Sequence, residues 1–146
     1  MREHIPDHTI DAWARLQRAS QSVLSAVESD LKAAGYPPLA WYDVLLELKR
    51  AGKDGLRPLA LQSQMLLAQY NLSRLLDRMA REGCVERKPC PNDKRGQIVV
   101  ITPAGRQLLK RMWPAYEAAI QRHFAERLSA EESTRLARLL GKLLPS

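Results

Sequence analysis

One short stretch interrupts a chain whose apolar residues otherwise recur with helical spacing. Residues 84–88 and 97–101 carry β-branched side chains, and the segment between them, 89–96, is rich in turn-forming residues. This pattern predicts a β-hairpin with a long tip that carries Lys94 and Arg95. The fold class to expect is therefore mainly α with a small β-hairpin.

Helices are expected on both sides of the hairpin. Apolar residues at steps near three and four predict them over 9–34, 39–51, 58–65, 68–82 and 103–126, and again from residue 129 onwards. Gly83 supplies a stop before the hairpin, and Thr102 can cap the helix that Pro103 begins. A helix-turn-helix followed by a basic hairpin is a winged helix.

Composition excludes several classes of protein. The 146 residues suit a single domain, and no apolar run approaches the ~20 residues that a membrane span needs. No signal-peptide pattern is seen, so we expect a soluble, cytoplasmic protein without a membrane partner. The two cysteines form no CxxC pair, and the three histidines are not spaced as metal ligands. Because no catalytic or phosphate-binding motif is found either, we expect no enzyme, no cofactor and no metal.

The positive charge is concentrated in one part of the chain. The formal net charge is +7, and residues 70–111 contribute ten basic and four acidic side chains, which leaves only +1 for the remainder. A concentrated excess of this kind is typical of a polyanion-binding surface. Nucleic acid, anionic lipid and an acidic protein all fit this charge.

The helix expected over 68–82 has two contrasting faces. Leu72, Leu75, Leu76 and Met79 fall on one side and are expected in the core. The rest of the surface carries hydroxyl, amide and guanidinium groups that suit base edges and phosphates, and the candidates are Gln69, Tyr70, Asn71, Ser73, Arg74 and Arg78. The alternative is a solvated face with intrahelical pairs such as Arg74 with Asp77.

The hairpin adds a second set of candidates, namely Lys88, Asp93, Lys94 and Arg95. A thin ribbon with cations at its end suits a duplex minor groove, whose negative potential attracts arginine. Asp93 can accept hydrogen bonds from loop amides or from the Arg95 guanidinium, and so hold that arginine extended. The alternative is a solvent-exposed polar turn.

The run from Asn71 to Gly83 resembles the recognition helix of the MarR family of transcriptional regulators. The segments 85–87, 93–96 and 102–106 are similar to the hairpin and exit helix of that family. The similarity covers the whole chain in length and helix order, and the aspartate-x-arginine element at Asp93 and Arg95 is its most specific part.

The resemblance implies a homodimeric winged helix-turn-helix protein that binds double-stranded DNA. It divides the one compact chain into an N-terminal dimerisation helix (1–38), a winged-helix DNA-binding region (39–102) and C-terminal dimerisation helices (103–146). It also implies that Asp93 positions Arg95, and that Arg95 enters the minor groove. The function to expect is a ligand-responsive repressor that binds a palindromic operator.

Three points stay open at this stage. The resemblance implies a small aromatic or anionic effector, while Trp13, Trp41, Tyr42 and Trp113 suit either a ligand pocket or ordinary packing. Cys84 is expected in the core, and Cys90 is either a thiol activated by nearby lysines or an incidental loop residue. The alternative function is a winged-helix module that binds a protein and has no sequence-specific DNA binding.

Overall fold

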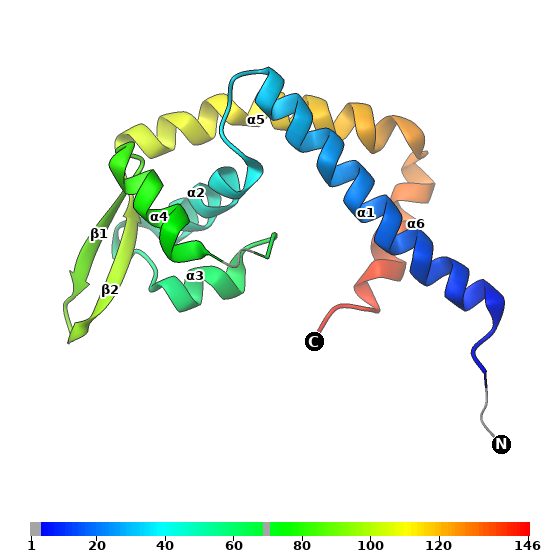
Figure 1. Ribbon diagram of the computed structural model, residues 1–146, viewed down its shortest axis with the longest axis horizontal. Helices are drawn as coiled ribbons and strands as arrows, with labels where there is room; N and C mark the ends of the chain where they lie inside the picture. The colour runs from blue at the N-terminus through cyan, green and yellow to red at the C-terminus, as the bar shows by residue number, and fades with distance from the viewer. Residues whose placement is uncertain (1–3, 69–70) are drawn as a thin grey trace.

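The computed structural model describes residues 4–68 and 71–146, except for the side chain of Lys94. Six α-helices and one antiparallel hairpin are the main elements of this part of the chain (Figure 1). The helices are α1 (Asp7–Ala33), α2 (Leu39–Ala51), α3 (Pro58–Gln64), α4 (Leu72–Arg81), α5 (Pro103–His123) and α6 (Ala130–Gly141). The strands are β1 (Val85–Cys90) and β2 (Asp93–Ile101). The predicted class, a mainly helical winged helix, is confirmed.

Helix α4 is shorter than the sequence predicts. The expected start was Ala68, but the helix begins at Leu72 and Asn71 occupies its N-cap position. Ahead of the helix, Asp43 on α2 accepts the backbone amides of Leu66 and Leu67 and holds that segment against α2. The carboxyl end agrees with the prediction, since Gly83 has a φ of 77°, a conformation that glycine adopts without strain.

The hairpin strands are longer and its tip is shorter than expected. The two strands pair as far as Pro89 opposite Gln97, and Cys90 then pairs with Asp93 across an irregularity in the register. The register therefore skips residues 94–96 on β2. The predicted eight-residue tip was too long, because β1 continues to Cys90 and β2 begins at Asp93, with residues 94–96 forming a bulge inside β2.

A third segment fastens the hairpin to the helices. Leu56, between a short 3-10 turn and α3, exchanges two backbone hydrogen bonds with Val99 on β2, at 3.0 and 2.8 Å. The approach is close enough that a Cβ on Gly55 would lie 2.4 Å from the Val99 carbonyl oxygen. Glycine at this position lets the segment reach β2.

One core joins the helices of both ends to the helix-turn-helix. Leu31 of α1, Leu45 of α2, Leu76 of α4 and Met112 of α5 are all fully buried in the same cluster. The hairpin lies at one end of the molecule and the first turns of α1 lie at the other (Figure 1). Helix α5 runs from the hairpin toward α6.

The start of α5 packs directly on the start of the hairpin, and we predict that Gly105→Ala is destabilising. An added Cβ would lie 2.1 Å from the Cys84 carbonyl oxygen, so backbone would have to move. Overpacking of this kind costs about 1–3 kcal/mol. Urea denaturation measures the change in the free energy of unfolding.

Gly141→Ala is the matched control, because this helical glycine has open space around its Cβ position. Alanine there should not lower stability, because its Cβ meets no other atom. Equal effects of the two substitutions would contradict the packing described.

Candidate nucleic-acid interface

Helix α4 separates its apolar and polar residues completely. Its four buried side chains are those that the sequence assigns to the core, namely Leu72, Leu75, Leu76 and Met79. Ser73, Arg74 and Arg78 are exposed, and so is Asn71, whose side chain makes no capping hydrogen bond. Gln69 and Tyr70 lie outside the described residues. Asn71, Ser73 and Arg74 therefore stand at the amino end of the helix, where recognition helices contact bases.

The hairpin presents Lys88, Asp93 and Arg95 as exposed side chains. Lys94 lies in β2, but its side chain is outside the description. Asp93 acts as predicted toward the loop amides, since its Oδ1 accepts the Arg95 backbone N–H at 3.0 Å. The Asp93 carboxylate thus fixes the backbone position of Arg95.

An ion pair joins α4 to the hairpin. Asp77 on α4 binds Arg87 on β1, and the Arg87 side chain is three-quarters covered. This pair replaces the intrahelical contact of Arg74 with Asp77 that the sequence also allowed. In the described part of the chain Arg74 forms no ion pair, so its guanidinium is available for a ligand. Sequence reasoning missed Arg87 because the pair spans two elements.

A second ion pair reaches the hairpin from α3. Arg57 Nη1 lies 3.7 Å from Asp93 Oδ2, and Arg57 Nη2 lies 3.2 Å from the Cys90 sulfur. Cys90 therefore has an arginine as a cationic neighbour, which the sequence did not predict. Cys84 is buried as expected, and burial raises the pKa of its thiol, as does the nearby Glu82 carboxylate.

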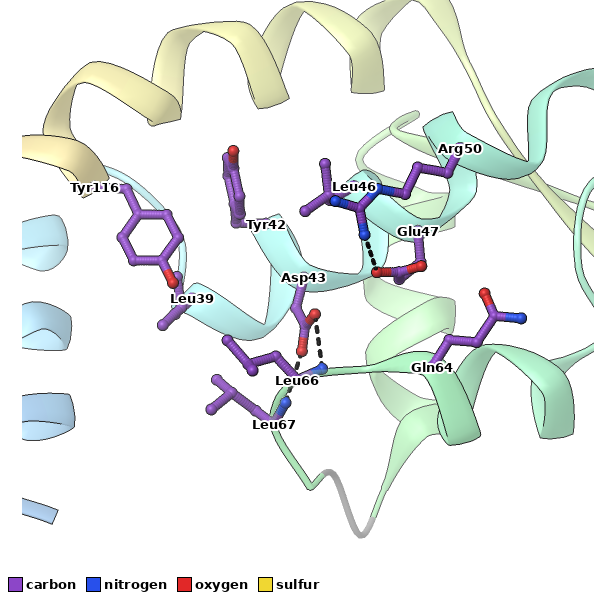
Figure 2. Close-up of a pocket in the computed structure, with 10 residues that line it drawn as sticks. All are labelled: Leu39, Tyr42, Asp43, Leu46, Glu47, Arg50, Gln64, Leu66, Leu67 and Tyr116. Carbon is purple, nitrogen blue, oxygen red and sulfur yellow. Dashed lines mark hydrogen bonds and ion pairs between the residues drawn. The ribbon is translucent and has the colours of Figure 1, made fainter. Parts of the chain in front are cut away.

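A pocket of about 310 Å³ lies between α2, α5 and the segment before α4 (Figure 2). This volume is at the lower end of the range for small-molecule sites. Tyr42 and Tyr116 supply aromatic walls with their ring centroids 5.0 Å apart, and Arg50 supplies a cation that also pairs with Glu47. Of the four aromatic residues considered from the sequence, Tyr42 lines this pocket, and Trp113 stacks on Tyr42 from outside it.

The pocket is physically tied to the start of α4. Buried Asp43 lies in its wall, and the Asp43 carboxylate accepts the amides of Leu66 and Leu67 at 3.0 and 2.8 Å (Figure 2). Burial raises the pKa of the Tyr116 phenol, and Asp43 raises it further. Tyr116 is therefore a protonated hydrogen-bond donor at neutral pH.

Within residues 4–68 and 71–146, no three His, Cys, Asp or Glu side chains are grouped as metal ligands would be. None of the helices described there is both long and apolar enough to cross a membrane.

The arrangement defines a class of protein. A helix-turn-helix of α3 and α4, followed by a basic two-stranded hairpin that is fixed to α4, is a winged helix-turn-helix module. The MarR family model matches residues 34–96, which run from the end of α1 into the hairpin.

Known proteins agree over a longer span. The multiple antibiotic resistance protein MarR of Salmonella typhimurium is 33% identical over 104 residues, which cover 71% of each chain. A MarR family transcriptional regulator from Streptomyces coelicolor, crystallised with DNA, superposes with a TM-score of 0.86 at 23% identity, over 98% of this chain and 89% of that one. A cysteine-to-serine variant of MarR from Escherichia coli, complexed with operator DNA, superposes with a TM-score of 0.80 at 26% identity. The superposition covers 98% of this chain and 100% of that one. The chain belongs to the MarR family of transcriptional regulators.

Asp43 supports the loop that leads into α4, and we predict that Asp43→Ala destabilises the protein. Removing the carboxylate leaves two amides without their acceptor, which costs about 1–3 kcal/mol for each group that water does not reach. Asp11→Ala is the control, because Asp11 forms only an exposed pair with Arg15 on α1. Urea denaturation compares the two variants, and equal free energies of unfolding would contradict the role given to Asp43.

Proposed function

We propose that two copies of this chain form a homodimer that binds double-stranded DNA at a near-palindromic operator and represses transcription. The observation that carries this proposal is the free cationic face at the start of α4, held beside a basic hairpin by Asp77 and Arg87. Asn71, Ser73 and Arg74 contact bases in the major groove, with Arg78 on the adjacent backbone. Arg95 enters the minor groove, and Lys88 and Lys94 bind phosphates. Gln69 and Tyr70 extend the base contacts.

The dimer is supported by apolar side chains that the described chain leaves exposed. They lie on the first half of α1 and at the carboxyl end, away from the hairpin, and include Ile10, Trp13, Leu139, Leu143 and Leu144. Exposed apolar surface of this extent is typical of a protein–protein interface. A twofold axis through this region places the two α4 helices at a fixed separation, which requires half-sites about one helical turn apart.

Selection of bound duplexes from random DNA tests the proposal. We expect a near-palindromic sequence with half-sites about 10 base pairs apart, centre to centre. On that duplex, Arg95→Ala should weaken binding at least tenfold, because it removes a minor-groove contact without touching the dimer helices. Fluorescence anisotropy measures the affinity, and sedimentation confirms the dimer.

Two results would contradict this account of DNA binding. Selection without enrichment of any sequence would favour a module that binds a protein instead. Full affinity of Arg95→Ala would remove the hairpin from the interface.

An effector site in the α2–α5 pocket is part of the same proposal. A small aromatic carboxylate lies in this pocket against the contacting rings of Tyr42 and Tyr116, with Arg50 as its counterion and the Tyr116 hydroxyl as a donor. Because Asp43 in the pocket wall also holds the segment before α4, a ligand there favours a dimer whose α4 helices are wrongly placed.

We predict that benzoate and related aromatic acids weaken DNA binding about 5–150-fold at saturation, the usual range of coupling between two sites. Arg50→Ala should abolish this response and keep the affinity for DNA. Arg15→Ala, which also removes one positive charge, should keep both the response to the acid and the affinity for DNA. The anisotropy titration is repeated at rising acid concentration, and an unchanged response in Arg50→Ala would place the effector elsewhere.

A further inference from the structure

Arg57 occupies an unusual position for its residue type. It stands at the N-cap of α3, where Ser, Thr, Asp or Asn usually accepts a backbone amide. A guanidinium has no acceptor atom, and no side-chain hydrogen bond caps this helix. The side chain instead leaves the helix and reaches the tip of the hairpin.

Its contacts there form a connected set. The guanidinium touches the Cys90 sulfur on β1 and faces Asp93 Oδ2 on β2, while Asp93 Oδ1 accepts the Arg95 amide. Arg57 is thus linked through one carboxylate to the backbone of Arg95. The site is closely fitted, because a Cβ on Gly96 would lie 3.3 Å from Asp93 Oδ2 and 3.5 Å from Arg57 Nη1.

The backbone of Arg57 is itself fixed to the hairpin. The preceding residue, Leu56, exchanges two hydrogen bonds with Val99, near the carboxyl end of β2. The segment therefore holds β2 near its carboxyl end through the backbone and at the hairpin tip through the Arg57 side chain. Two attachment points on one strand restrict its rotation about either point.

We propose that Arg57 is a positioning residue for DNA binding, which orients the hairpin tip so that Arg95 is presented to the minor groove. This inference rests on the proposed function. The pair is exposed, with Arg57 53% and Asp93 45% accessible, so its contribution to folding is small. Its effect falls on the orientation of Arg95 and hence on affinity for DNA.

A double-mutant cycle on the selected operator tests the proposal, with wild type, Arg57→Ala, Arg95→Ala and the double variant. Arg57→Ala should weaken binding about two- to fivefold, the fold-change that corresponds to an exposed ion pair. In the Arg95→Ala background the same change should have almost no effect, because the side chain that Arg57 orients is gone. Arg15→Ala controls for the loss of one positive charge far from the hairpin.

The same factor in both backgrounds would overturn the proposal, because it would mean that Arg57 contacts DNA by itself. No effect of Arg57→Ala on wild-type affinity would also overturn it. Thermal unfolding of each variant checks that the fold is retained.

A second measurement is independent of DNA. Hydrogen exchange of the Arg95 amide, followed by NMR in the free protein, should be at least twofold faster in Arg57→Ala than in wild type or Arg15→Ala, because Asp93 loses its partner. Unchanged exchange would overturn the positioning role. If wild type binds no duplex, the proposed function fails while this measurement still decides whether Arg57 holds the hairpin.

Discussion

The molecule depends on the one-sided burial of α4. Leu72, Leu75, Leu76 and Met79 fill the core with one face of a ten-residue helix, and no polar residue of the helix is buried with them. A helix this short gains most of its stability from packing rather than from its own hydrogen bonds. Apart from Asp77, which pairs with Arg87 on β1, the opposite face contributes little to folding, and the chain places hydroxyl and guanidinium groups there. Folding and binding thus use different residues of the same element.

Polar links then set the position of that helix and of the hairpin. Asp43 fixes the segment before α4, and the Asp77–Arg87 pair fixes α4 to β1. An ion pair that is exposed to solvent adds little to the free energy of folding, yet it restricts where the two elements that it joins lie relative to each other. Asp43 also lines the pocket between α2 and α5, so one carboxylate belongs both to the pocket wall and to the support of Leu66 and Leu67.

The sequence predicts what periodicity and local chemistry determine. Helix α2 was predicted with its observed bounds, and the buried face of α4 follows from apolar spacing alone. The start of α4 was predicted at Ala68 instead of Leu72, and Asp43, the acceptor that holds the chain just before this point, lies on α2 and leaves no mark on the local pattern. Arg57 was missed for the same reason, since its partners Cys90 and Asp93 are more than thirty positions away. Contacts between distant segments leave no local signal.

The central claim is that two copies present matched α4 helices and hairpins to one face of a duplex. Hydroxyl-radical footprinting on the selected operator tests it most directly, because the radical reports minor-groove and backbone protection at single-nucleotide spacing. We expect two stretches of DNA to be protected from the radical, related by a twofold axis. Each lies where a hairpin enters the minor groove outside a half-site. A single tract without twofold symmetry, or protection that is absent beyond the half-sites, would contradict it.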